Sequence, residues 1–378
     1  MFLVVLLLCG AVFINPLAAR ADQTTLPLPV RIEKFDSVKI GETREFWVSL
    51  PDRYAESGEK YPVLYMLDGE FNFNSGGIGG LRFAAQMGEI PEFIIVGIKN
   101  TDRAKDVFPE EITYSDGSKA GGRADRFLDF IRDELIPHID KNYRTENFRV
   151  LYGTSNSGFT AVYALFRNPD LANLYVAASA TLRVPILQAQ RDQWIREFKA
   201  GKRGLALVMG EHDYPTIISQ NGELKEKIGL IAPADLTCRV AVIGNGGHVP
   251  AEALLTGLRG LFEGWKIIPP LTEKTFAGIR AQVDARLEKF GLAERLSEES
   301  LKDLGESLLE QKKYAPAVEV LRYRAESYPR SADARVSLGE AYVRSGQPNL
   351  ARECFQQALV LSPNHAAATA KLKDLDKK

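Results

Sequence analysis

Cysteine and histidine are scarce in this chain of 378 residues, which contains three cysteines and four histidines. Cys9 lies in an apolar amino-terminal stretch, and Cys238 and Cys354 lie in segments that we expect to form different domains. This distribution argues against a disulfide framework, so a large apolar core must stabilise the fold. Because Cys and His do not cluster and no phosphate-binding loop motif occurs, we expect no metal and no organic cofactor.

Net charge is almost absent as well. The 48 Lys and Arg residues against 49 Asp and Glu residues give a formal charge of −1. No basic field is available to hold nucleic acid or an anionic membrane surface, so we expect no nucleic-acid partner. A hydrophobic content of 45% and a charged content of 26% are ordinary for a soluble globular protein. The length fits two domains, one of them large.

Long apolar runs are missing except at the amino terminus, where residues 2–14 are almost wholly apolar. This run is too short to cross a bilayer, which needs about 20 residues. Ala19-Arg20-Ala21 before Asp22 has the form of a signal-peptidase site. We therefore predict a signal peptide over residues 1–21, an exported protein (periplasmic or secreted), and no stable membrane span after its removal. No Lys or Arg precedes the apolar run, so an uncleaved anchor is the alternative.

A pattern of short strands begins after the amino-terminal stretch. Residues 31–35 and 45–50 alternate between apolar and polar side chains, with turn residues at 40–43, and predict an antiparallel pair at a sheet edge. Beyond them, apolar runs alternate with helical stretches, which is typical of a mostly parallel sheet buried on both faces. The runs cover residues 63–67, 93–98, 148–152, 174–178, 205–209 and 239–243.

Two helices of this part are well marked by their periodicity. Apolar side chains recur at helical spacing over residues 124–139 and again over residues 250–265. The second helix follows the last strand, so we expect an α/β domain over residues 28–267. Pro269-Pro270 and the charged residues after it predict a connector to a second domain.

The second domain carries a sequence repeat. Its matched positions lie 34 residues apart in every pair: Leu304-Gly305 with Leu338-Gly339, Leu308 with Tyr342, Ala317 with Ala351, Leu321 with Phe355, and Pro329 with Pro363. This period and pattern are those of tetratricopeptide repeats, and we predict a small all-α domain over residues 275–374. Two repeats rarely bury a stable core alone, so a helix over residues 277–292 should pack on them or bridge to the first domain. A protein or peptide partner is expected at these repeats.

Residues 153–158, Gly-Thr-Ser-Asn-Ser-Gly, follow an apolar strand and precede an apolar helix over residues 159–166. This strand–turn–helix setting is typical of a nucleophile elbow and predicts Ser155 as the catalytic nucleophile. Against the pattern G-x-S-x-G, Ser157 replaces the second glycine, and serine is small enough to leave the elbow intact. The alternative is a Gly-Ser-rich turn that merely ends the strand.

The catalytic base can be chosen by elimination among the histidines. His138 lies in a helix before the elbow, and His365 lies after the second repeat. His212 follows a strand, with an acid on either side. His248 lies in a glycine-rich turn after the last strand and before a helix, as the hydrolase chain order Ser, acid, His requires. We therefore predict His248 as the general base.

The acid of the triad should follow the preceding strand, which points to residues 210–213. We predict Asp213, with Glu211 as the open alternative; the acid would hold the imidazole tautomer and stabilise the imidazolium. An oxyanion hole needs two backbone N–H groups. One would come from Asn156, the residue after the nucleophile, and the other from the loop over residues 67–70.

At these residues the sequence resembles the Putative esterase family of α/β hydrolases, especially its siderophore-esterase and esterase D-like members. Residues 61–70, reading YPVLYMLDGE, are similar to the Y-P-V-L-Y-L-L-D-G segment of that family. Residues 100–103, residues 143–145 and Gly247-His248 also resemble members close to the siderophore esterases. The resemblance covers residues 28–265 and implies the α/β-hydrolase fold. It also implies Glu70, which follows L-D-G, as the second oxyanion donor.

The resemblance implies a serine esterase that acts through an acyl-enzyme on a small-molecule ester, such as a siderophore lactone or a small acyl ester. The family usually reads G-x-S-x-G-G at the elbow, so Asn156-Ser157 is a departure that bears on rate and acyl preference. The alternatives are an acyltransferase of the same fold, or an inactive hydrolase-fold protein that binds a partner through its helical repeats.

The loop over residues 100–109 follows a strand on the predicted active-site side. Arg103, with Lys105 and Asp106, would suit an anionic or catechol-like substrate. The alternative is structural, because an Asp–Arg pair in a loop usually holds the turn by a salt bridge.

Overall fold

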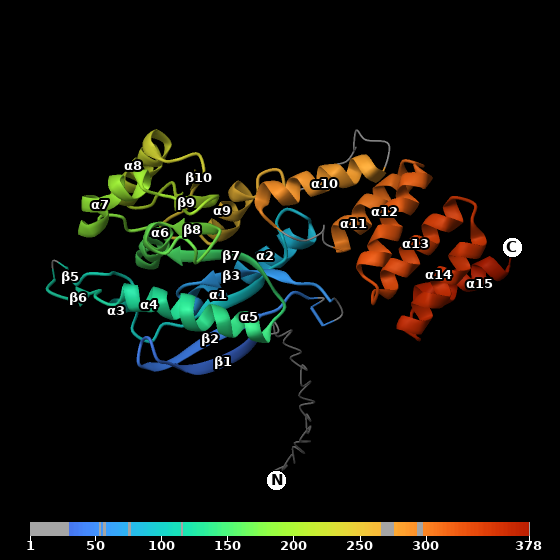
Figure 1. Cartoon of the computed structure of the whole chain (residues 1–378), viewed down its shortest axis with the longest axis horizontal. Helices are drawn as coiled ribbons and strands as arrows, with labels where there is room; N and C mark the ends of the chain where they lie inside the picture. Colours follow the sequence, from blue (N-terminus) through green and yellow to red (C-terminus); the bar gives the residue numbers. More distant parts are fainter. Residues whose placement is uncertain are drawn as a thin grey trace, which may run out of the picture.

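The computed structural model describes residues 30–52, 54–55, 58–74, 77–114, 116–265, 276–292 and 298–377. The predicted signal peptide over residues 1–21 and the predicted connector at Pro269-Pro270 lie outside these ranges. The described chain forms an α/β part and a helical part, with α10 (Phe276–Phe290) running between them (Figure 1). No helix within the described ranges is both long and apolar enough to span a bilayer.

Eight strands of the described chain form one sheet in the order β1-β2-β4-β3-β7-β8-β9-β10. The strands are β1 (Val30–Ser37), β2 (Glu42–Ser49), β3 (Tyr61–Met66), β4 (Ile94–Ile98), β7 (Thr145–Thr154), β8 (Leu174–Ala178), β9 (Arg203–Gly210) and β10 (Leu236–Ile243). From β4 to β10 neighbouring strands are parallel, whereas β1 and β2 pair antiparallel at the edge. Every residue of β3 and β4 is buried. The predicted parallel sheet with an antiparallel edge is therefore confirmed.

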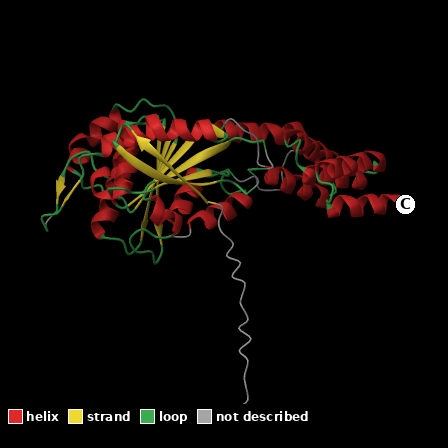
Figure 2. Cartoon of the chain, turned by 90° about the horizontal axis from the view of Figure 1, so that it is seen from below, coloured by secondary structure: helices red, strands yellow, loops and turns green. Residues whose placement is uncertain are grey.

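Helices cover both faces of the sheet. Side chains alternate along each strand, so successive residues of a strand pack beneath different helical layers. Val63 and Tyr65 belong to the core beneath one helical layer, and Leu64 and Met66 belong to the core beneath the other. The first layer contains α4 (Ala124–Phe130), α5 (Ile136–Asn142), α6 (Asn156–Arg167), α7 (Pro185–Arg196) and α8 (Pro215–Ile231), and the second contains α1 (Gly69–Asn74), α2 (Gly77–Gln86) and α9 (Ala253–Leu261). Figure 2 shows the strands between these layers.

Two predicted helices differ in detail from the observed ones. The helix expected over residues 124–139 consists of α4, a π-helical turn η1 (Ile131–Leu135) and α5 in direct succession. The helix expected over residues 250–265 is shorter and is α9. The loop after β4 contains the short helix α3 (Arg103–Asp106) and a two-stranded ribbon of β5 (Ile112–Thr113) and β6 (Lys119–Ala120), which periodicity does not reveal.

The helical part confirms the predicted repeat. Its helices are α11 (Glu298–Glu310), α12 (Tyr314–Ser327), α13 (Ala332–Arg344), α14 (Pro348–Leu361) and α15 (Ala366–Asp376). A Cβ atom on Gly305 would lie 2.4 Å from the side chain of Leu321, and one on Gly339 would lie 2.4 Å from the ring of Phe355. Both repeats therefore need glycine at the same place, where the second helix of each pair packs closely on the first.

The predicted bridging role of the helix at residues 277–292 is confirmed by its packing. The ring of Phe290 in α10 lies 5.5 Å from that of Phe262 and 5.7 Å from that of Trp265. Leu287 contacts both the helical core and the second core of the α/β part. Beyond α10, Tyr328 is buried, and this burial together with a hydrogen bond to Glu59 raises the pKa of its hydroxyl. The repeats are thus attached to the α/β part at two places.

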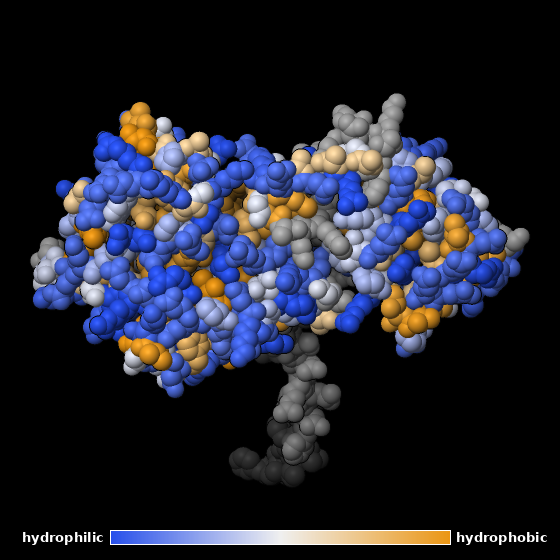
Figure 3. Space-filling view, in the orientation of Figure 1, coloured by the Kyte–Doolittle hydropathy of each residue, from blue (hydrophilic) through white to orange (hydrophobic). Residues whose placement is uncertain are grey.

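The surface in Figure 3 is mostly hydrophilic, and hydrophobic residues gather on this face only in small, separate groups. The most exposed of the large apolar side chains in the described chain include Val38 in the turn between β1 and β2, Leu230 in α8 and Val360 in α14. Scattered apolar side chains of this kind are normal for a globular protein.

Candidate active site

Ser155 lies at the sharp turn between β7 and α6. Its backbone has φ 54° and ψ −116°, a conformation that a residue with a side chain rarely adopts. The turn is held because the N–H of Ser155 donates to the carbonyl oxygen of Ala178, at 2.8 Å, on the neighbouring strand β8. A Cβ on Gly153 would lie 2.1 Å from the carbonyl oxygen of Ser157, so the chain needs glycine there. The strand–turn–helix predicted around Ser155 is therefore present.

Three side chains from different loops form a hydrogen-bonded chain at this turn. The Oγ of Ser155 lies 3.0 Å from Nε2 of His248, and Nδ1 of His248 lies 2.8 Å from Oδ1 of Asp213. Asp213 is buried, whereas about a third of the His248 side chain is exposed, at 32%. A carboxylate can only accept, so Nδ1 carries the ring proton and Nε2 is free to accept the hydroxyl proton of Ser155.

The loops after β9 and β10 are tied together, which brings the acid to the histidine. The N–H of His212 donates to the carbonyl oxygen of Gly246 at 2.8 Å. After His248 the chain turns again, and the N–H of Val249 donates to Oγ of Ser179 at 2.9 Å. These bonds fix the backbone on both sides of the imidazole, so the ring is oriented before a substrate arrives.

Of the two acids left open by the sequence, Asp213 is the one in contact with His248. The carboxylate of Glu211 instead accepts the backbone N–H of Asn245 at 3.0 Å, in an exposed position. The catalytic role of Asp213 remains a prediction, and of these two acids Asp213 has the contact with the imidazole that the role requires.

Two of the remaining histidines lie in other parts of the fold. His138 contacts Glu33 at 3.0 Å and stacks beside Phe35, and His365 contacts Asp333 at 3.0 Å at the start of α15. Neither of these two histidines is bonded to the turn that carries Ser155. The choice of His248 from chain order therefore agrees with the structure, in which His248 contacts Ser155.

The two predicted oxyanion donors lie at the starts of helices. Asn156 is the first residue of α6, and Glu70 is the second residue of α1. Amides in the first turn of a helix have no acceptor within that helix, as a predicted oxyanion donor requires. The loop carrying Glu70 is joined to the elbow, since Asp68 and Ser157 share a hydrogen bond of 2.7 Å.

Arg103 lies against Asp68. Its Nε donates to Oδ1 at 2.7 Å and its Nη2 to Oδ2 at 2.9 Å, while Asn100 donates to Oδ1 at 2.8 Å. Burial alone would raise the pKa of Asp68, but the hydrogen bonds and charge of Arg103, with the bonds from Asn100 and Ser157, outweigh it and hold the pKa below its ordinary value. The same pairing raises the pKa of Arg103. The ion pair with Asp68 is the structural role that the sequence left open for Arg103. Contact between Arg103 and a substrate stays a prediction.

The other charged residues of that loop are paired as well. Lys105 contacts Asp102 at 2.9 Å in an exposed position. Asp106 is buried and binds Arg44 and Arg123, each at 2.7 Å. For Asp106 the structural alternative applies, because its buried carboxylate is paired with two arginines.

Three exposed aromatic side chains adjoin the site, and sequence reasoning did not single them out. Phe71 follows Glu70 and is 54% exposed, and Tyr214 follows Asp213 and is 63% exposed. The ring of Tyr214 lies 5.1 Å from that of His248. The hydroxyl of Tyr114, after β5, accepts from the side chain of Asn156 at 3.3 Å. Adjacency to predicted site residues could have revealed Phe71 and Tyr214, whereas no local signal points to Tyr114.

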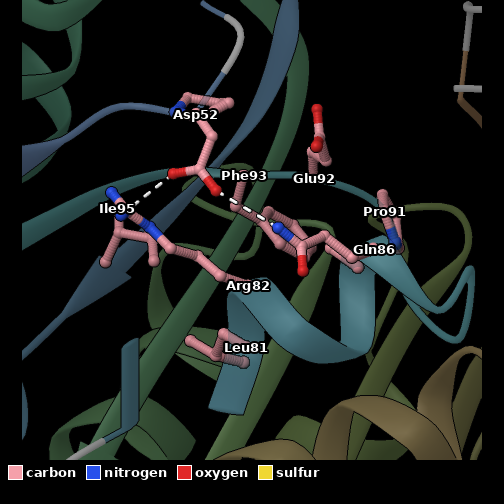
Figure 4. A pocket seen from close by; sticks show the side chains of 10 residues that line it. Asp52, Leu81, Arg82, Gln86, Pro91, Glu92, Phe93 and Ile95 are labelled. Carbon is pink, nitrogen blue, oxygen red and sulfur yellow. Dashed lines mark hydrogen bonds and ion pairs between the residues drawn. The ribbon is translucent and has the colours of Figure 1, made fainter. Parts of the chain in front are cut away.

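A small pocket between α2 and the loops beside it lies apart from these residues (Figure 4). Arg82 contacts Asp52 at 3.0 Å and Gln86 donates to the same carboxylate at 3.3 Å, so the pocket is crossed by its own polar contacts. A cavity of about 20 Å³ has room for about one water molecule. No group of three or more His, Cys, Asp or Glu side chains within the described ranges is placed to hold a metal ion.

The mostly parallel sheet, with a serine on the turn between a central strand and its helix, defines an α/β hydrolase. The family described as Putative esterase matches residues 37–236, more than half of the chain. The chain belongs to this family and is an ester-hydrolysing enzyme. A Tetratricopeptide repeat matches residues 332–365, which are α13, α14 and the turn that follows.

Several relatives are similar to this chain. Ferri-bacillibactin esterase BesA of Bacillus subtilis (strain 168) is 22% identical over 221 residues, which cover 52% of this chain and 76% of the relative. Siderophore triacetylfusarinine C esterase of Aspergillus fumigatus is 28% identical over 171 residues, covering 42% of this chain and 58% of the relative. The solved structure of an IroE-like serine hydrolase from Shewanella oneidensis is 27% identical with a TM-score of 0.70, covering 79% of this chain and 99% of that one.

Proposed function

We propose that the chain hydrolyses a carboxylic ester through an acyl-enzyme on Ser155. The observation that carries the proposal is the continuous hydrogen-bonded chain from Ser155 through His248 to Asp213, with contacts of 3.0 and 2.8 Å. His248 Nε2 takes the hydroxyl proton as Ser155 Oγ attacks the ester carbonyl, and Asp213 stabilises the imidazolium. The same Nε2 then returns the proton to the departing alkoxide.

The second half of the reaction reverses these roles. Water enters in place of the alcohol, gives a proton to His248 Nε2 and attacks the acyl carbonyl, and Ser155 leaves as the protonated hydroxyl. In both halves the carbonyl oxygen becomes an oxyanion, and the N–H groups of Asn156 and Glu70 would donate to it. Donors fixed in helix first turns need no rearrangement as charge develops, which is how such groups lower the barrier.

The substrate that we propose is a siderophore lactone or another small ester with a planar, apolar part. One relative is named as a ferri-bacillibactin esterase and another as a siderophore esterase, which supports an ester of that class. Phe71 and Tyr114 add exposed aromatic surface beside the two predicted oxyanion donors, and Tyr214 adds it beside the base. Aromatic side chains bind planar groups by stacking and apolar contact, so these three residues suit such a substrate.

The test is to give the purified protein a panel of esters: a catecholate siderophore trilactone, a hydroxamate siderophore ester, a feruloyl ester and p-nitrophenyl acetate. Products are separated by liquid chromatography and identified by mass, with Ser155→Ala as the control. We expect cleavage by the wild-type protein and at least about a thousandfold slower cleavage by Ser155→Ala. Cleavage of no ester by the wild-type protein, or equal cleavage by both proteins, would contradict the proposal.

A further inference from the structure

The hydroxyl group of Ser157 is buried in the elbow and has three polar neighbours. Ser157 is 2% exposed, and its Oγ accepts the N–H of Thr154 at 2.8 Å. The same Oγ lies 2.7 Å from Oδ2 of Asp68 and 2.9 Å from the carbonyl oxygen of Thr154. Its single proton can serve only one acceptor, and the charged, nearer carboxylate is the stronger one. Ser157 therefore ties the elbow to the loop after β3.

Asp68 carries this tie to the start of α1. Its backbone has φ 52°, a left-handed conformation in which a non-glycine residue needs support from its surroundings. Its carbonyl oxygen accepts the N–H groups of Phe71 and Asn72, both at 3.0 Å, so Asp68 begins the helix. Glu70 lies within that first turn, two residues after Asp68. A displacement of the Asp68 carboxylate would therefore move the amide of Glu70 with it.

We propose that Ser157 is a positioning residue of the oxyanion site. Its hydroxyl, acting through Asp68, keeps the N–H of Glu70 aimed at the same point as the N–H of Asn156, the residue directly before Ser157. The proposal rests on the ester hydrolysis proposed above. Oxyanion donors are effective only within about 2.7–3.1 Å of the oxygen as it becomes charged, so a small displacement of one donor lowers the rate.

This role depends on the departure from the family pattern. A glycine at position 157, which the pattern G-x-S-x-G-G has, would provide neither the acceptor for the Thr154 N–H nor the donor to Asp68. The sequence indicates that serine is small enough for the elbow and that the departure at 156–157 bears on rate and acyl preference, but it names no partner for the hydroxyl. In the structure, the Oγ of Ser157 contacts both Thr154 and Asp68. These two segments lie far apart in the sequence, since Ser157 and Asp68 are 89 positions apart.

Ser157→Ala and Ser157→Gly test the role by removing the hydroxyl. The matched control is Tyr175→Phe, which removes another fully buried hydroxyl that accepts a backbone N–H, from Ala172 at 3.2 Å. Tyr175 lies at the start of β8, away from the strand end that meets Ser155. With p-nitrophenyl acetate, we expect kcat to fall about tenfold to hundredfold in both Ser157 variants with KM little changed. Tyr175→Phe should keep the wild-type kcat.

A second measurement separates positioning from a general loss of structure. A boronic acid that forms a tetrahedral adduct on Ser155 mimics the oxyanion, so its Ki should rise by the factor by which kcat/KM falls. Thermal melting monitors the fold, and Ser157→Ala, which keeps helix propensity, carries the test if Ser157→Gly does not fold. An unchanged kcat, an unchanged Ki with a lowered kcat, or an equal loss in Tyr175→Phe would each overturn the proposal. A wild-type protein that is neither active nor acylated would instead refute the proposed function, and the positioning role would fall with it.

Discussion

The Oγ of Ser155 lies 3.0 Å from Nε2 of His248, although 93 positions separate the two residues in the chain. The parallel sheet brings the two residues together, because β7, which precedes Ser155, and β10, which precedes His248, end at the same edge of the sheet. Ser155 is held there in a strained backbone conformation, and the loop of His248 is bonded on both sides. The fold thus brings the two predicted catalytic residues together without a bound substrate.

The acid is tested by two matched variants. Asp213→Asn should lower kcat/KM by about a hundredfold to ten-thousandfold, because the imidazole loses the carboxylate that fixes its tautomer. Glu211→Gln should change kcat/KM by less than about threefold, since the Glu211 carboxylate accepts from the exposed Asn245 amide and does not contact His248. Steady-state kinetics with p-nitrophenyl acetate checks both. Equal and mild effects would mean that Ser155 and His248 act as a pair without an acid.

The proposed role of the exposed aromatic side chains Phe71, Tyr114 and Tyr214 is tested by Phe71→Ala. We expect KM for an aromatic ester to rise about twofold to tenfold in this variant and KM for an aliphatic ester to stay unchanged. The reason is that only a planar group can stack on the ring of Phe71. Leu230→Ala is the control, since Leu230 is 70% exposed and lies in α8. Equal changes for both esters would show that Phe71 does not select aromatic substrates.

The contribution of α10 and the helical part to stability is tested by two truncated chains, both of which start at residue 22. A chain ending at residue 292 keeps α10 on Phe262 and Trp265, whereas one ending at residue 270 exposes both rings. We expect the shorter chain to be less stable by about 2–5 kcal/mol, which is the range for losing large buried apolar side chains. Denaturant unfolding and kcat/KM check this.

Both truncated chains should hydrolyse esters while folded, because every residue placed in the chemistry precedes residue 270. Equal stabilities would refute the packing role of α10. A folded but inactive chain ending at residue 292 would show that the repeats are part of the enzyme.

The ion pair of Asp68 predicts how stability depends on pH. Its pKa in the folded protein lies below the ordinary value, so the ionised carboxylate stabilises the fold above that ordinary value. This contribution disappears as the pH falls through the lowered pKa. Asp68→Asn should be less stable at neutral pH by about 3 kcal/mol, and its deficit should shrink on acidification. A deficit that is the same at all pH values, measured by urea unfolding, would refute this.

The sequence predicted those parts of the fold that depend on local patterns. Apolar runs marked the buried strands because a parallel sheet is covered on both faces. The period of 34 marked the helix pairs because each repeat places Gly305 or Gly339 against the same partner position. The chain order Ser, acid, His then predicted that Ser155 and His248 lie at the same edge of the sheet.

Other parts depend on contacts that no local pattern records. The bond between Ser157 and Asp68 joins residues 89 positions apart, and neither residue type predicts it alone. The β5–β6 ribbon has only two residues in each strand, too few for a periodic signal, and it brings Tyr114 to Asn156. The pairing of Asp106 with Arg44 has no local signal for the same reason, since Arg44 lies on β2.

The most direct measurement of the central claim is the mass of the protein during turnover. The wild-type protein is mixed with p-nitrophenyl acetate, quenched in acid within milliseconds, and analysed intact and after proteolysis, with Ser155→Ala treated in parallel. The account predicts a burst of nitrophenol equal to one acyl group per molecule, with the added acetyl mass on the peptide that contains Ser155 and none on the variant. An acetyl group on another residue, or the same burst from Ser155→Ala, would contradict it.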